Sequence, residues 1–223
     1  MTIAHHISDE LLLEYAAGSL AEGWSVAVAT HLALCPHCRT RLQAMEATAA
    51  GLLEEIEPAA ADIGSGDGWA AMKDRLASVT QDAPAPAARP APEGPAPDVP
   101  EPLRSYLGGD LATLKWRALG LGAYHYPIAT GDKTISTRLL RIPAGKPVPE
   151  HGHGGRELTL VLKGAFHDEG GRFGPGDFEE TDSAIQHQPV AEPGEDCICL
   201  AVTDAPLRFR SRVVRFIQPL LGI

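Results

Sequence analysis

A proline-rich segment near the middle of the chain constrains its fold more than any other feature. Between Gln81 and Pro102 lie eight prolines and six alanines in 22 residues, without apolar periodicity. Such a composition predicts an extended, polyproline-II-like spacer. At about 3.1 Å per residue, it would separate the flanking parts by up to roughly 60 to 70 Å. The sequence therefore predicts two domains, residues 1–80 and 103–223, that move independently.

The acidic charge is concentrated in the first domain. Residues 1–80 hold 4 basic and 11 acidic side chains, residues 103–223 hold 14 of each, and the whole chain carries a net charge of −10. Nucleic-acid affinity depends on Lys and Arg displacing counterions, so this charge argues against direct DNA or RNA binding. It favours a protein partner with a basic surface.

Membrane and disulfide features are both weak in this sequence. The apolar runs are far shorter than the ~20 residues that cross a bilayer, and the N-terminus lacks the regions of a signal peptide. We therefore expect a cytoplasmic protein that does not contact a membrane. The cysteines form two close pairs, which are too few for a disulfide scaffold in 223 residues. Cys197 and Cys199 share one face of an expected strand, where core packing is favoured over a redox role.

Helical signals fill the first domain. Ser8 is a suitable N-cap and Gly18 a suitable left-handed stop for a first helix. The segment Ser19-Leu20-Ala21-Glu22 has the pattern of a capping box, which predicts a second helix running to about Leu34.

Two further helices are expected after this pair. Pro36 is acceptable only in the first turn of a new helix, which the apolar pattern continues to Pro58. After a glycine-rich break, Asp67 can cap a fourth helix that runs to Val79. This fourth helix has no place in the core of the first three and is expected to be detached from them.

The second domain has the pattern of strands. Alternating or β-branched runs are bounded by Gly, Pro and Asp turns at close spacing, as in Thr134 to Ile142, Leu158 to Leu162 and Cys197 to Val202. The expected fold class is thus α + β with two domains, and the second domain is an antiparallel barrel or sandwich.

A first group of metal-binding residues lies between the second and third helices. His31, Cys35 and Cys38 form an H-x3-C-x2-C pattern, in which one helical turn places His31 beside Cys35. Zinc prefers four ligands of this kind. His6 is the best candidate for the fourth, with His5 and His37 as competitors, and the bound Zn²⁺ would staple the small helical domain together.

This pattern resembles the zinc-binding anti-sigma domain, whose motif is an upstream His followed by H-x3-C-x2-C. In that family, the helical domain wraps an alternative sigma factor of the extracytoplasmic-function type. A separate fourth helix completes the grip. The acidic charge and the detached segment from Asp67 to Val79 are consistent with this resemblance.

A second group of metal-binding residues lies among the expected strands. His151 and His153 are two apart, so they face the same way on a strand, and Glu157 returns to the same pocket. His187 lies downstream at the spacing of a hairpin that would close the site. Three imidazoles and a carboxylate suit Zn²⁺, Fe²⁺, Mn²⁺, Ni²⁺ or Cu²⁺. The sequence does not choose among these ions, and Zn²⁺ is the one expected first.

The spacing of these ligands resembles the cupin family, a small jelly-roll barrel with a metal inside. The first motif, from Gly145 to Gly164, matches at every specified position. The second motif keeps Gly176 and His187, but Asp182, Ala184 and Ala191 stand where the family often has Pro, Gly and Asn.

Together the two resemblances cover nearly the whole chain. A zinc anti-sigma domain followed by a cupin domain is similar to the ChrR-type zinc anti-sigma factors. Those are cytoplasmic regulators that release a sigma factor under singlet oxygen or related oxidative stress, and the cupin domain would serve the signal response. The alternative is a metal-dependent cupin dioxygenase or hydrolase with an accessory zinc module. No other catalytic group is evident in the sequence, so a non-enzymatic protein is expected. The cognate sigma factor, the signal and the oligomeric state are left open.

Overall fold

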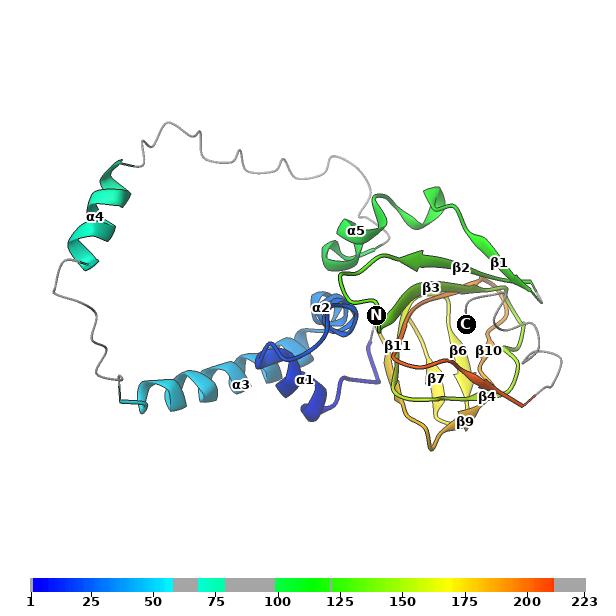
Figure 1. Cartoon of the computed structure of the whole chain (residues 1–223). Helices are drawn as coiled ribbons and strands as arrows, with labels where there is room; N and C mark the ends of the chain where they lie inside the picture. The colour runs from blue at the N-terminus through cyan, green and yellow to red at the C-terminus, as the bar shows by residue number, and fades with distance from the viewer. Residues whose placement is uncertain (1, 58–67, 79–98, 121, 211–223) are drawn as a thin grey trace. The chain divides into compact units, whose positions relative to one another are not determined.

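The computed structural model describes residues 2–57, 68–78, 99–120 and 122–210 (Figure 1). The helices are α1 (Asp9–Ala16), α2 (Glu22–Leu34), α3 (Pro36–Glu54), α4 (Gly68–Ser78) and α5 (Glu101–Leu107), followed by a 3-10 turn at Leu111–Thr113. The strands are β1 (Arg117–Gly120), β2 (Ala123–Ile128), β3 (Ser136–Ile142), β4 (His151–Gly152), β5 (Glu157–Lys163), β6 (Phe166–Asp168), β7 (Gly171–Phe173), β8 (Phe178–Thr181), β9 (Gln186–His187), β10 (Val190–Ala191), β11 (Cys197–Thr203) and β12 (Arg208–Phe209).

An antiparallel barrel forms the C-terminal half, as the strand pattern predicts. Its main sheet has the order β1-β2-β3-β11-β5-β8, and two small sheets, β10-β6-β7 and β12-β4-β9, complete it. The expected runs correspond to β3, β5 and β11, which are hydrogen-bonded neighbours in the order β3-β11-β5 within the main sheet.

The central strands are buried on both faces, and the two faces have different neighbours. Alternate residues of a strand point to opposite faces of its sheet. On β5, Glu157 and Thr159 line a cavity inside the barrel, whereas Leu158 and Leu160 are fully buried in the core that also includes the helices. The same alternation on β11 directs Cys197 and Cys199 into the barrel, and their neighbour Leu200 toward the helices.

The helix ends follow the sequence signals only in part. Ser8 caps α1 by accepting a hydrogen bond from the amide of Leu11, and Gly18 has the expected positive φ of 67°. The predicted capping box is wrong: α2 starts after Ala21 without a side-chain cap. The reason is that Ser19 and Glu22 bond elsewhere. The Ser19 hydroxyl donates to the carbonyl of Glu14, and the Glu22 carboxylate accepts from the hydroxyl of Tyr106, 2.7 Å away.

Helix α2 lies directly on the barrel. It packs against β5, β11 and α5, and Gly23 is the point of closest approach. A Cβ added at Gly23 would lie 2.4 Å from Oγ1 of Thr137 and 3.3 Å from the Val202 side chain. Only glycine fits where the backbone of the helix approaches the sheet so closely.

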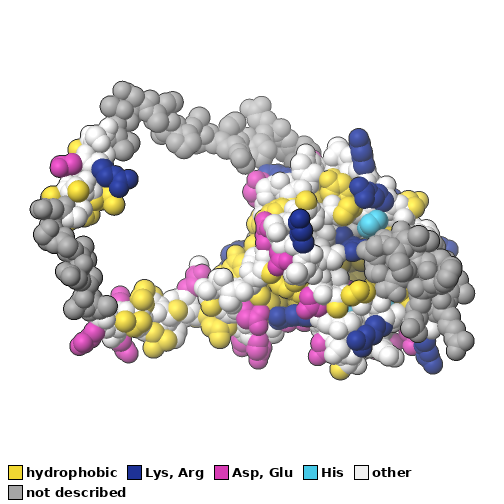
Figure 2. Space-filling view, viewed as in Figure 1, with side chains coloured by type: hydrophobic (Ala, Val, Ile, Leu, Met, Phe, Trp, Pro, Cys, Tyr) yellow, Lys and Arg dark blue, Asp and Glu magenta, His cyan; other side chains and the backbone are white. Residues whose placement is uncertain are grey.

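Helices α3 and α4 carry apolar side chains that solvent reaches (Figure 2). Helix α3 begins at Pro36 as predicted and ends at Glu54, before the expected end at Pro58. Helix α4 confirms a fourth helix, while the proposed cap Asp67 and the proposed end Val79 lie outside the described residues. The large exposed apolar residues of α3, of the short turn after it and of α4 are Leu52, Leu53, Ile56, Trp69, Met72 and Leu76.

The compact units of the chain differ from the predicted domain boundaries. Residues 1–46 form one compact unit together with residues 97–223, and residues 47–96 form the other. A shared core explains the first unit, because α1 and α2 bury their apolar face against the main sheet. The spacer from residue 81 to 98 lies outside the described residues, and α5 begins at Glu101, inside the end of that predicted segment. None of the described helices is long and apolar enough to span a membrane.

Candidate metal centres

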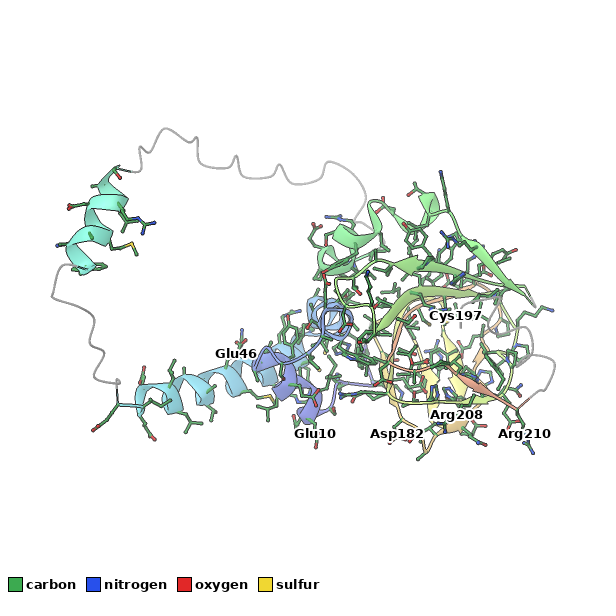
Figure 3. The ribbon with its side chains drawn as sticks, viewed as in Figure 1. Glu10, Glu46, Asp182, Cys197, Arg208 and Arg210 are labelled. Carbon is green, nitrogen blue, oxygen red and sulfur yellow. The ribbon has the colours of Figure 1, made fainter. Side chains whose placement is uncertain are left out.

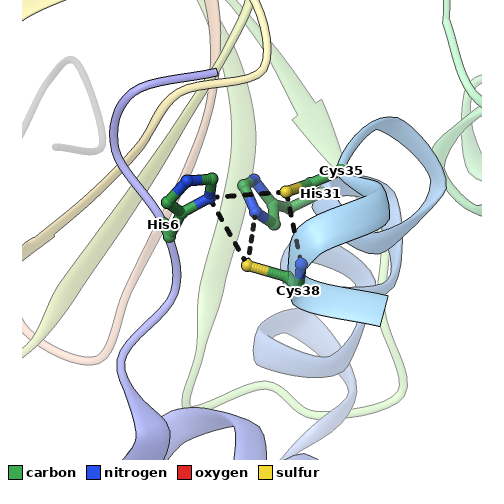
Figure 4. Close-up of side chains that lie close together, drawn as sticks. All are labelled: His6, His31, Cys35 and Cys38. Atoms are coloured by element: carbon green, nitrogen blue, oxygen red, sulfur yellow. Dashed lines mark hydrogen bonds between the residues drawn. The ribbon is translucent and has the colours of Figure 1, made fainter. Parts of the chain in front are cut away.

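The four residues predicted for the helical site converge on one point (Figure 4). Nδ1 of His6 lies 3.4 Å from Sγ of Cys35 and 3.6 Å from Sγ of Cys38, and Nε2 of His31 lies 3.3 Å from Sγ of Cys38. Zn–S and Zn–N bonds of about 2.3 and 2.05 Å in a tetrahedron require N···S separations of about 3.6 Å. The donor atoms therefore have the spacing of a tetrahedral metal site.

The junction of α2 and α3 provides three of these ligands. Cys35 ends α2 in an extended conformation, while its amide still bonds the carbonyl of His31. The chain then enters α3 at Pro36, and the amide of Cys38 donates to Sγ of Cys35 over 3.4 Å. An amide that points at a sulfur stabilises a thiolate, which is the form that binds metal.

His31 is prepared for metal binding by its surroundings. Its ring is fully buried, and its Nδ1 lies 2.9 Å from the carbonyl oxygen of Gly176 on the barrel. A carbonyl only accepts, so Nδ1 carries the proton and Nε2 directs its lone pair toward Cys38. Burial lowers the pKa of His31 to about 4, which leaves the ring neutral at pH 7. Burial also raises the pKa of the Cys38 thiol, a cost that a bound cation would offset.

The two competing histidines have other partners. Nε2 of His5 bonds the carbonyl oxygen of Arg172 over 3.0 Å, and its ring packs on Phe173. His37 lies beside the ring of His6, with 4.7 Å between ring centroids. The geometry thus favours His6 as the fourth ligand.

Inside the barrel, the three predicted histidines form a second cluster. Nε2 of His153 lies 3.2 Å from Nε2 of His187, close to the ~3.3 Å edge of a tetrahedron of zinc-bound nitrogens. The Nδ1 atoms of His151 and His187 bond to the carbonyl of Pro149 and the carboxylate of Asp168, 2.9 and 2.7 Å away. These bonds leave both Nε2 atoms to face the centre.

Glu157 lies next to this cluster but is not one of its converging donors. Its Oε2 is 3.4 Å from Nδ1 of His153, and its other oxygen contacts the hydroxyl of Thr159. Nδ1 of His153 has no hydrogen-bond partner in the described part of the chain. The predicted ligand is therefore in the same cavity, beside the other ring nitrogen of His153.

Two buried acids near His187 were missed by the sequence interpretation. Asp168 is almost fully buried, and Glu179 approaches Nδ1 of His187 within 3.5 Å. Burial alone would lower the pKa of His187, but the bonds and charges of Glu179 and Asp168 outweigh it and raise this pKa to about 9. Burial lowers the pKa of His151 to about 4. No local motif marks Glu179, since only the alternation of β8 places it inside the barrel.

A cavity of about 460 Å³ opens beside the histidines. Its wall is mainly apolar and includes Phe166 and Phe209, together with both cysteines of β11. The Sγ atoms of Cys197 and Cys199 are 3.5 Å apart, and both thiols are free (Figure 3 marks Cys197). The cysteines thus pack in the core as predicted, while also facing this cavity.

Comparison with known proteins agrees with both halves of the structure. Residues 106–206 match the family model of the ChrR cupin-like domain. The chain is 50% identical over all 223 residues to the anti-sigma-E factor ChrR of Cereibacter sphaeroides, and the match covers 100% of both proteins. It also resembles the crystal structure of Rhodobacter sphaeroides SigE in complex with the anti-sigma ChrR, with a TM-score of 0.73 and 45% identity over 91% of this chain and 99% of that one. The chain belongs to the family of ChrR anti-sigma factors.

Proposed function

We propose that this protein is an anti-sigma factor that binds a sigma factor of the extracytoplasmic-function type and keeps it from RNA polymerase. The observation that carries the proposal is the 50% identity with an anti-sigma-E factor over the full length of both chains. The similar crystal structure is that of an anti-sigma protein bound to SigE. The function is binding without turnover, and its place is the cytoplasm, where sigma factors meet the polymerase.

The apolar side chains of α3 and α4 supply a binding surface for the sigma factor. Leu53 is 69% exposed, Trp69 68% and Leu76 61%. Large apolar side chains this exposed on one helix indicate a surface that a protein partner covers, and each of the two helices carries such side chains. Trp69 is of the residue type that most often dominates binding energy at interfaces. We propose that residues 1–80 contain this grip.

Zinc is the metal proposed for the helical site. Two thiolates and two imidazoles at tetrahedral spacing suit Zn²⁺. The ion would tie the segment before α1 to the junction of α2 and α3, so it would fix the orientation of α3. For the barrel we propose Zn²⁺ held by His151, His153 and His187, with the Glu157 carboxylate turning from the His153 ring toward the ion to supply a fourth ligand.

The barrel is proposed to control release of the sigma factor. Its cavity places metal ligands beside two free thiols and an apolar wall, which are groups that a chemical signal such as singlet oxygen can reach or modify. A change in this pocket shifts the sigma-binding helices only if it favours one of two states of the protein. Catalysis by a dioxygenase or hydrolase is not needed for this role.

A reconstituted transcription assay tests the proposal. The full-length chain should inhibit transcription that depends on its cognate sigma factor, while Trp69→Asp and Leu76→Asp should weaken inhibition without changing thermal stability. Ala71→Asp, at an exposed position of the same helix, adds the same single negative charge and is the matched control. The proposal would be contradicted if neither the parent chain nor the control inhibited any of the sigma factors from the same genome with which it was co-expressed.

The proposed role of the barrel has its own test. His151→Ala should remove metal from the barrel, preserve inhibition in resting cells and blunt induction of the target promoter by singlet oxygen. Normal induction in that variant would show that the barrel metal is not part of the response.

A further inference from the structure

Strand β8 lies between the two metal centres and contacts both. The strand and the turn before it, residues 174–181, contain side chains that alternate between the barrel interior and the helical part. Glu179 faces inward, where its carboxylate approaches Nδ1 of His187 within 3.5 Å. Its two neighbours along the strand, Phe178 and Glu180, face the helices.

The outward side of this segment holds the helical metal site at several points. The carbonyl of Gly176 accepts from Nδ1 of His31, and the Phe178 ring packs edge-on against the His31 ring at 5.4 Å. These are contacts to a metal ligand itself. A displacement of β8 therefore moves one ligand of the helical site.

The same segment also holds the extended chain around His6. Oδ1 of Asp177 accepts from the amides of Ala4 and His5, 2.6 and 2.9 Å away, and the amide of Phe178 donates to the carbonyl of His5. Both oxygens of Glu180 accept from Ser8, one from its amide and one from its hydroxyl, at 2.7 and 2.9 Å. The chain that carries His6 is thus bound to β8 on both sides of that ligand.

The two cysteines of the helical site have no such contact with β8 among the described hydrogen bonds. The rings of His6 and His31 are thus positioned by contacts with the barrel, whereas Cys35 and Cys38 are positioned only by the junction of α2 and α3, which also carries the backbone of His31. A shift of β8 would pull His6 and His31 away from Cys35 and Cys38, which weakens tetrahedral coordination.

We infer that β8 couples the two metal centres, so that loss of the metal ion inside the barrel loosens the metal ion in the helical site. The occupied barrel site fixes His187 and, through it, Glu179. When the barrel site is empty, His187 no longer fixes Glu179, so β8 is less firmly held on its inner side. The strand then positions His6 and His31 less firmly. This inference specifies the release step of the proposed function and rests on it, because the helical site organises the sigma-binding helices.

Cobalt spectroscopy on the full-length chain can measure this coupling without any sigma factor. With Co²⁺ in both sites, thiolate-to-cobalt absorption reports the site that contains Cys35 and Cys38, and Cys35→Ser identifies that band. The decay of the band after addition of excess EDTA gives the rate of metal loss from the helical site. His151→Ala empties the barrel site, and His187→Gln serves as a second emptied variant in case the first does not fold.

We expect the band to decay at least about fivefold faster when the barrel site is empty, the lower end of typical coupling between sites. Glu180→Ala should reduce this ratio to less than twofold, because the strand then no longer holds Ser8. Glu195→Ala is the matched control: it removes a glutamate that pairs with Lys163 at 3.8 Å and has no described contact with residues 174–181, so it should preserve the ratio.

The inference would be overturned if emptying the barrel site of the otherwise unchanged chain accelerated the decay by less than this factor. It would also be overturned if Glu180→Ala left the ratio of the two decay rates unchanged. Because the measurement contains no sigma factor, its failure is separate from a failure of the proposed function. A chain that couples the two metals but inhibits no sigma factor would contradict the proposed function alone.

Discussion

At the residue scale, three of the clustered histidines are oriented by a bond to their other ring nitrogen. His31, His151 and His187 each direct Nδ1 at a carbonyl or carboxylate oxygen. Such a bond fixes both the tautomer and the direction of the ring, so the metal meets a ready ligand. The sequence spacing predicts the residues that cluster, but it does not predict these partners, because Gly176 and Asp168 come from distant parts of the chain.

The choice between His5 and His6 can be tested by single substitutions. His6→Ala should weaken zinc binding by more than the roughly 10- to 100-fold that is typical when a ligand loses its hydrogen-bond partner, because Nδ1 of His6 faces both cysteines. His5→Ala is the matched control, since its ring bonds to Arg172. Competition with a chromophoric chelator measures both affinities, and the reverse ranking would assign the ligand to His5.

The shifted histidines predict how the metal-free protein responds to pH. His31 and His151 have pKa values lowered to about 4 from 6.5, so their contribution to stability is complete above pH 6.5 and is lost as the pH falls toward 4. His187 has a pKa raised to about 9, so its contribution is complete below pH 6.5 and is lost as the pH rises toward 9.

The free energy of unfolding of the metal-free protein, prepared with a chelator, should therefore be highest near pH 6.5. Each group changes it by up to roughly 1.4 kcal/mol per pH unit within its window. Urea unfolding at pH 5, 6.5 and 9 measures this profile. His187→Gln should flatten the alkaline side and keep the acidic side, and an unchanged alkaline loss would assign it to other groups.

At the scale of elements, the sequence predicts what depends on near neighbours and misses what depends on distant ones. The period of the apolar residues and local caps such as Ser8 predict α1 to α4 and the three long strands. The start of α2 was missed because Glu22 bonds to Tyr106 and to the amide of Gly131, contacts that exist only after folding. Glu179 was missed for a second reason: a four-residue strand carries too little pattern to show which of its sides is buried.

The contact of α2 with the barrel predicts a large effect at Gly23. Gly23→Val should lower the free energy of unfolding by about 1 to 3 kcal/mol or more, because the added side chain collides with Thr137 and Val202. Gly51→Ala, on α3, is the control: its added Cβ has no atom within 4 Å, and alanine favours a helix. Thermal or urea unfolding compares the two. Equal stability of both variants would show that α2 does not rest on the sheet in solution.

At the scale of the whole molecule, the predicted spacer and the compact units lead to different expectations for a fragment. The sequence predicts that residues 1–80 inhibit the sigma factor alone. In the structure, α1 and α2 share a core with the main sheet through residues such as Leu12 and Val28. A fragment would expose that apolar face to water, and each Å² of exposed apolar surface lowers the free energy of unfolding by roughly 25 cal/mol.

We expect residues 1–80 to inhibit transcription when zinc is bound, with a lower melting temperature than the full chain. The four proposed zinc ligands all lie within this fragment, and a bound ion would compensate for part of the lost core. Transcription assays and thermal unfolding of the fragment, with and without zinc, measure both properties. A zinc-loaded fragment that fails to inhibit, while the full chain succeeds, would show that the barrel is part of the grip.

The position of β11 in the sheet also has a consequence during synthesis of the protein. This strand sits between β3 and β5 and spans Cys197–Thr203, so the main sheet cannot close until almost the whole chain has left the ribosome. Translation proceeds at about 5 to 20 residues per second, which leaves the face of α1 and α2 uncovered for roughly 8 to 30 s after these helices emerge. During that interval the nascent helices have all four zinc ligands but no barrel to rest on. A sigma factor made nearby would therefore meet the proposed zinc site of the helices before the barrel, which we propose to control release, has folded.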